Sequence, residues 1–218
     1  MQNRRQILSR RQLLSGTSIF ILGALSGGLA LPAWLARPAR ASPAADQASA
    51  FIKETGVKLV AAINAAGSVD ERRKVVGGII DTDVDVNGVA RFCLGRFWRT
   101  ATPAEQQQYL SLFRDVLVAN IAVKLGEYRG VRFTVGATQD RDAGEVVSTI
   151  VDRPNNPPTN IQWLVANPTS GPKIIDVIAE GTSLRITQRD DYAAFLSQHG
   201  NQLEALFGAM RQQLTQGG

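Results

Sequence analysis

The sequence contains one cysteine and one histidine among 218 residues, and these shortages exclude several kinds of protein. A single cysteine cannot form an internal disulfide, and one cysteine with one histidine cannot supply the four ligands of a structural zinc site. Nucleophilic catalysis by a triad would need His199 as its base. The chain also has no G-x-x-x-x-G-K-[ST] loop, so we expect it to hydrolyse no nucleotide itself.

Acidic residues are absent from the first 41 positions, which hold six arginines. The rest of the chain has 18 basic against 19 acidic residues, so the net charge of +5 is a property of the N-terminal segment alone. Residues 42–218 show no basic stripe with interleaved aromatic residues. The composition therefore predicts no binding to nucleic acid.

The first 41 residues have the three parts of an export signal. Arginines come first, an uncharged and moderately apolar stretch follows over residues 12–36, and Ala39-Arg40-Ala41 is a small-x-small cleavage site. The paired Arg10 and Arg11 resemble those of a twin-arginine signal. We expect cleavage after Ala41, which would leave residues 42–218 as a single domain in the bacterial periplasm. An uncleaved membrane anchor is the alternative.

The spacing of apolar residues changes twice along residues 42–218. Up to about Leu125 it is helical, and Thr102-Pro103-Ala104-Glu105 forms a capping box with proline at the first helical position. From about Gly130 to Ile186 the period becomes two, in segments separated by turn residues. Helical spacing then returns as far as Leu214. The four alternating segments are 131–135, 147–151, 161–165 and 175–179.

Short turns between these segments predict an antiparallel meander. Helices before and after the strands, with no alternation of strand and helix, indicate an α+β fold. We therefore expect a curved, four-stranded antiparallel sheet flanked by N-terminal and C-terminal helices. Such a sheet can close over a solid core or around a cavity.

Two groups of carboxylates are candidate sites. Asp81, Asp83 and Asp85 have the spacing of a calcium loop, but valine and phenylalanine stand where that loop needs glycine and glutamate, so we expect a loop with helix caps instead. Asp176 and Glu180 lie four residues apart on one predicted strand and would share a face. They could be the acid–base pair of a small α+β enzyme, or simply solvated or ion-paired carboxylates.

Two strings are specific enough to compare with known families. The first is Leu94-Gly95-Arg96-Phe97-Trp98-Arg99-Thr100-Ala101-Thr102, and the second is Asp176-Val177-Ile178-Ala179-Glu180-Gly181-Thr182-Ser183. In this order they resemble the MlaC family, the periplasmic phospholipid-binding proteins of the Mla (toluene-tolerance) pathway. The resemblance extends over essentially all of residues 42–218.

The resemblance implies a monomeric, non-enzymatic carrier with no cofactor or metal. It would hold a glycerophospholipid with its acyl chains in an apolar cavity between sheet and helices. It would shuttle lipid between an inner-membrane ABC transporter complex and an outer-membrane lipoprotein–porin complex, in the pathway for outer-membrane lipid asymmetry. A small enzyme using Asp176 or Glu180, or a non-catalytic envelope interaction module with a solid core, are the alternatives.

An acyl chain in water costs about 0.8 kcal/mol per CH₂, so a carrier must surround it with apolar side chains. Fourteen residues are candidates for this lining, for each of which ordinary core packing is the alternative. The helical candidates are Phe97, Trp98, Phe113, Leu117 and Ile121, and the strand candidates are Phe133, Val135, Val147, Val151, Ile161, Trp163, Val165, Ile175 and Val177.

Overall fold

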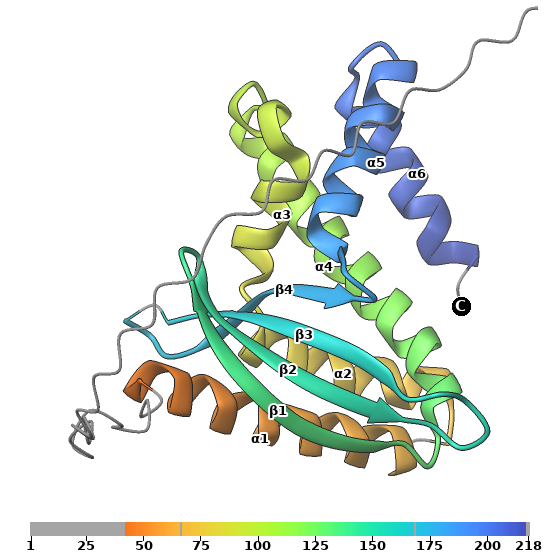
Figure 1. Ribbon diagram of the computed structural model, residues 1–218. Helices are drawn as coiled ribbons and strands as arrows, with labels where there is room; N and C mark the ends of the chain where they lie inside the picture. Colours follow the sequence, from red (N-terminus) through yellow and green to blue (C-terminus); the bar gives the residue numbers. More distant parts are fainter. Residues whose placement is uncertain (1–41, 66, 168, 217–218) are drawn as a thin grey trace, which may run out of the picture. The chain divides into compact units, whose positions relative to one another are not determined.

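The computed structural model of the protein describes residues 42–65, 67–167 and 169–216 (Figure 1). The predicted export signal, residues 1–41, lies outside the described residues. Within the described ranges, none of the helices has the length and hydropathy of a bilayer-spanning segment.

The described residues begin and end with helices and have a sheet between them, as expected for an α+β fold. Short 3-10 turns, η2 (Gly95–Arg99) and η3 (Gly126–Tyr128), follow the third and fourth helices. The helices are α1 (Pro43–Ala65), α2 (Val69–Asp83), α3 (Val86–Leu94), α4 (Pro103–Leu125), α5 (Leu184–Gln198) and α6 (Leu203–Gln216).

The predicted capping box at the start of α4 is confirmed. The Thr102 hydroxyl accepts the Glu105 N–H at 3.3 Å, and the Glu105 carboxylate accepts the Thr102 N–H at 2.7 Å. Asp85 caps α3 by accepting the Gly88 N–H at 2.9 Å. The loop with helix caps that we expected over Asp81, Asp83 and Asp85 is correct only for Asp85, because the other two lie within α2. No cluster of three potential metal ligands occurs in the described ranges.

The sheet is antiparallel, with its strands in sequence order. The four predicted strands are present, and a fifth, very short strand was not predicted. A two-residue turn of Glu180 (φ 51°) and Gly181 (φ 81°) joins the last two strands, and such left-handed turns suit the twist of hairpins. The strands are β1 (Arg132–Arg141), β2 (Gly144–Asp152), β3 (Thr159–Ala166), β4 (Lys173–Ala179) and β5 (Thr182–Ser183).

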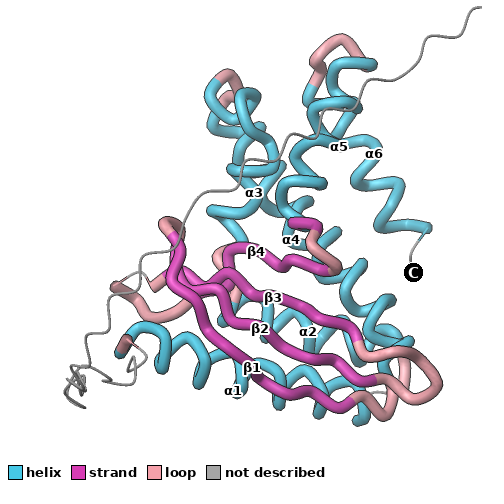
Figure 2. The backbone as a smooth tube through the Cα atoms, in the orientation of Figure 1, coloured by secondary structure: helices cyan, strands magenta, loops and turns pink. Residues whose placement is uncertain are grey.

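The strands of the sheet are curved (Figure 2). Register shifts between Val135 and Thr138 and between Leu164 and Val165 bend the strands locally, as bulges do. Helix α1 packs against β1 and β2, and α2 packs against α1 and α4. Helices α3 to α6 pack on one another beyond the β4 edge (Figure 1).

The buried apolar residues form four clusters, and partly buried side chains connect each cluster to a neighbouring one. The largest belongs to helices α3 to α6 and centres on Tyr109, whose ring is fully buried and whose hydroxyl donates to the Ala90 carbonyl at 2.9 Å. The other three join α1 to the sheet, α1 to the η3 end of the sheet, and α2 to α4. The side chains that two clusters share include Val84, Leu117, Leu125 and Phe133.

The contact of α1 with the sheet depends on Gly56, because a Cβ there would overlap the ring of Phe133. We expect Gly56→Ala to lower the free energy of unfolding by about 1–2 kcal/mol, since overpacking outweighs the better helix propensity of alanine. Gly78→Ala on α2 is the matched control, because nothing lies within 4 Å of its added Cβ. It should stabilise by about 0.5–1 kcal/mol. Urea denaturation measures both, and stabilisation by both changes would contradict this packing.

Candidate functional site

A cavity of about 570 Å³ lies between the sheet and helices α1 to α5. Pockets that hold small molecules typically measure about 300–1,000 Å³. Most of its lining is aliphatic or aromatic. The apolar lining from α1, α2 and α4 comprises Leu59, Val60, Ile63, Val76, Ile79, Ile80, Phe113, Val116, Leu117, Ile121 and Leu125.

The structure brings nine of the fourteen predicted lining residues together around this cavity. They come from α4 and from all four long strands, although those segments are far apart in the sequence. These nine are Phe113, Leu117, Ile121, Phe133, Val151, Ile161, Trp163, Ile175 and Val177.

The other five predicted residues lie outside the lining. Phe97 and Trp98 belong to the cluster of helices α3 to α6, where the Arg91 guanidinium lies 5.1 Å from the centre of the Trp98 ring. On the sheet, the remaining three pack against the N-terminal half of α1 in the cluster of Ala48 and Ile52. These three are Val135, Val147 and Val165.

Sequence reasoning did not assign the lining from α1 and α2. The stripe that includes Leu59, Val60 and Ile63 is visible in the sequence at helical spacing, but a stripe facing a cavity has the same pattern as one facing a solid core. No signal in the sequence separates the two cases. Only the position of α1 and α2 opposite the sheet does so.

The polar atoms of two lining residues have partners behind the cavity wall. The indole N–H of Trp163 donates to the Thr149 hydroxyl at 2.9 Å, and that hydroxyl donates to the Ile161 carbonyl at 3.0 Å. The Thr55 hydroxyl donates to the buried Asp83 carboxylate at 2.8 Å. Because these groups are satisfied away from the cavity, the lining keeps its apolar character.

Asp176 lies at the α5 end of the cavity, and its carboxylate is engaged in structural contacts. It accepts hydrogen bonds from the N–H groups of Val177 (2.8 Å) and Arg185 (3.2 Å) and from the Ser183 hydroxyl (2.6 Å). The Arg185 Nε lies 3.4 Å from it, in an ion pair. Glu180 is exposed in the β4–β5 turn, so the two carboxylates do not share a strand face, and this expectation was wrong.

Cys93 lines the cavity from α3, and burial raises the pKa of its thiol to about 12. We expect the folded protein at pH 8 to react with iodoacetamide roughly three orders of magnitude more slowly than the urea-unfolded chain, whose thiol has a pKa of about 8.5. Mass spectrometry of the labelled protein measures both rates. Comparable rates would contradict the burial of Cys93.

Several of the polar lining residues come from α4 and α5. Asn120 and Lys124 come from α4, and Thr187, Gln188 and Asp191 come from α5. Leu184, at the start of α5, also lines the cavity and is 51% exposed. At these residues the apolar lining of the cavity therefore meets solvent-exposed side chains.

The chain is similar to known proteins both in sequence and in fold. A family model described as MlaC protein matches residues 53–212. The chain is also similar to a solved structure of a phospholipid-binding protein from Ralstonia solanacearum in complex with a phospholipid. The TM-score is 0.68 at 22% identity, over 78% of this chain and 98% of that one. At this identity the similarity establishes a shared fold.

Proposed function

Because the chain belongs to the MlaC family of non-enzymatic periplasmic lipid carriers, we propose that it carries a glycerophospholipid with the acyl chains inside the cavity described above. The apolar lining of the cavity is the observation that carries this proposal. The transfer of an acyl chain from water to such a lining is favourable by about 0.8 kcal/mol of free energy per CH₂. The two acyl chains together therefore supply a large driving force for loading.

The cavity between the helices and the sheet supports a carrier over the solid-core interaction module. Side chains from α1, α2, α4 and the sheet, among them Leu117 and Phe133 that connect neighbouring core clusters, face a shared space instead of filling it. Empty apolar space inside a protein is costly, because its lining loses contacts that a packed core would make. An acyl chain in the cavity would restore these contacts.

The contacts of Asp176 weigh against the small-enzyme alternative. Its carboxylate already accepts three hydrogen bonds within the protein, and Glu180 lies in an exposed turn. An acid–base pair needs two carboxylates that can both reach the substrate. Asp176 is engaged in contacts within the protein and Glu180 lies apart from it in the turn, so the two do not form such a pair.

Native mass spectrometry of protein purified from the cell envelope tests the proposal. We expect the major species to be the chain with one bound phospholipid, and lipid extraction to return glycerophospholipid in about equimolar amount. A protein that never carries lipid, even after incubation with phospholipid vesicles, would overturn the proposal.

The cellular setting is also part of the proposal. Export by the twin-arginine route and cleavage after Ala41 would place residues 42–218 in the periplasm as a monomer. There the carrier would exchange lipid with an inner-membrane ABC transporter complex and an outer-membrane lipoprotein–porin complex. Mass spectrometry of the envelope protein should give a mature N-terminus at Ser42, and an N-terminus at Met1 would contradict cleavage.

A further inference from the structure

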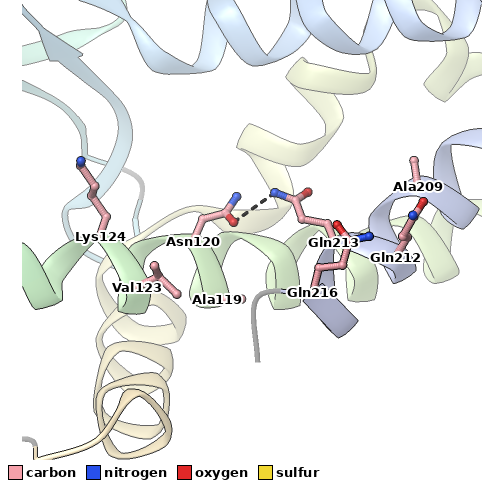
Figure 3. A pocket seen from close by; sticks show the side chains of 8 residues that line it. All are labelled: Ala119, Asn120, Val123, Lys124, Ala209, Gln212, Gln213 and Gln216. Atoms are coloured by element: carbon pink, nitrogen blue, oxygen red, sulfur yellow. Dashed lines mark hydrogen bonds between the residues drawn. The ribbon is translucent and has the colours of Figure 1, made fainter.

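A second, surface-facing space lies beside the cavity. It is a groove of about 520 Å³ between α4 and α6, with the small residues Ala119 and Ala209 among its lining. Figure 3 shows Asn120 and Gln213 facing each other across it, and their side-chain amides are hydrogen bonded at 3.1 Å. The groove is therefore formed by the packing of α4 against α6, which this hydrogen bond connects.

The groove and the cavity are adjacent, because Asn120 and Lys124 line both. These two residues are four positions apart on α4 and therefore lie on the same side of the helix, one turn apart. A molecule whose tails occupy the cavity could extend past this turn of α4 into the groove.

The two spaces differ in chemistry. The cavity is mostly apolar, whereas the groove presents the side-chain amides of Asn120, Gln212, Gln213 and Gln216 together with the Lys124 ammonium. Amides donate and accept hydrogen bonds, and an ammonium group has three N–H donors. The contact from Lys124 to Glu127, 2.7 Å long, is made between two exposed side chains, so a phosphate could compete for the ammonium.

We propose that the α4–α6 groove is the headgroup subsite of the carrier, in which Lys124 and the amide of Gln213 bind the phosphate and glycerol oxygens of a phospholipid. This inference rests on the proposed function, since it assigns the polar end of the same ligand. Phosphate suits a lysine ammonium as a point-charge partner, and amides suit the neutral oxygens beside it. The subsite thereby favours a phospholipid over a neutral lipid with the same tails.

The test compares two lipids that differ only in the headgroup. Delipidated full-chain protein is incubated with vesicles that contain palmitoyl-oleoyl phosphatidylethanolamine and palmitoyl-oleoyl glycerol in equal amounts, and the bound lipids are quantified by mass spectrometry. We expect the wild type to prefer the phospholipid, and the double variant Lys124→Gln/Gln213→Leu to lower this preference about tenfold.

Lys53→Gln is the matched control, because Lys53 is exposed on α1 and lines neither space. It should keep the wild-type preference. An unchanged preference in the double variant would overturn the subsite while leaving the carrier in place. If the wild type takes up neither lipid, the proposed function fails and the subsite fails with it.

A site for free phosphate would have the same chemistry, and a further titration separates the two. Delipidated protein titrated with inorganic phosphate should show no saturable change in the NMR signals of residues 120–124 at micromolar concentrations, because the headgroup depends on its attached tails for local concentration. Saturation in that range would identify an independent anion site and overturn the headgroup assignment.

Discussion

Val177→Arg should abolish lipid binding while the protein stays folded. Val177 lies on β4 and contributes to the cavity lining. A guanidinium there occupies part of the space for an acyl chain and draws water into the rest, and an unpaired charge against hydrocarbon costs several kcal/mol. We expect less than about a tenth of the wild-type amount of co-purified phospholipid by native mass spectrometry.

The stability of this variant distinguishes a cavity from a solid core. A long side chain can extend along a cavity towards solvent, so we expect the melting temperature of Val177→Arg to lie within about 5 °C of delipidated wild type. Delipidated protein is the proper reference, because bound lipid itself raises the melting temperature. Ile150→Arg is the matched control, since Ile150 is 49% exposed on β2 of the same sheet. It should retain lipid, and retention by Val177→Arg would contradict the assigned lining.

The sheet shows what alternation in the sequence can and cannot predict. Alternating valines indicated which residues share the inner face, and that inner face is observed. Yet Val147 and Val165 are covered by Ala48 and Ile52 of α1, whereas Val151 faces the cavity. The alternation of residues along a strand predicts the face of the sheet on which each side chain lies. It does not predict whether a helix or the cavity lies against that face. For that reason helix placement, and not the strands, divides the lining from the packed core.

Features that depend on a few neighbouring residues were easier to predict than the packing of distant segments. The capping box of Thr102 and Glu105 could be predicted because all of its atoms lie within four residues. The short strand β5 could not, since two residues are too few for a period to appear. Its turn at Glu180-Gly181 was not predicted either, because Glu180 was assigned to the preceding strand. This turn lies within the second string that resembles the MlaC family.

Asp176→Ala should destabilise the protein strongly, by about 3 kcal/mol in the free energy of unfolding. Only 6% of Asp176 is exposed, and its removal takes the acceptor from the N–H groups of Val177 and Arg185 and from the Ser183 hydroxyl. Ser183 is the N-cap of α5, so the connection from β4 to α5 loses its central contact. The Arg185 guanidinium would lose its ion pair with Asp176 and retain its contact with the face of the Phe92 ring, whose centre lies 4.6 Å away.

Acid-to-amide changes provide the matched comparison for this position. Asp176→Asn keeps the shape but removes the charge that pairs with Arg185, and it should cost about 2 kcal/mol. Glu180→Gln makes the same chemical change in the exposed turn four residues later and should cost less than about 0.5 kcal/mol. Urea denaturation measures all three variants. Equal effects at the two positions would contradict the structural role of Asp176, because only that carboxylate joins the sheet to α5 and thereby holds the end wall of the cavity.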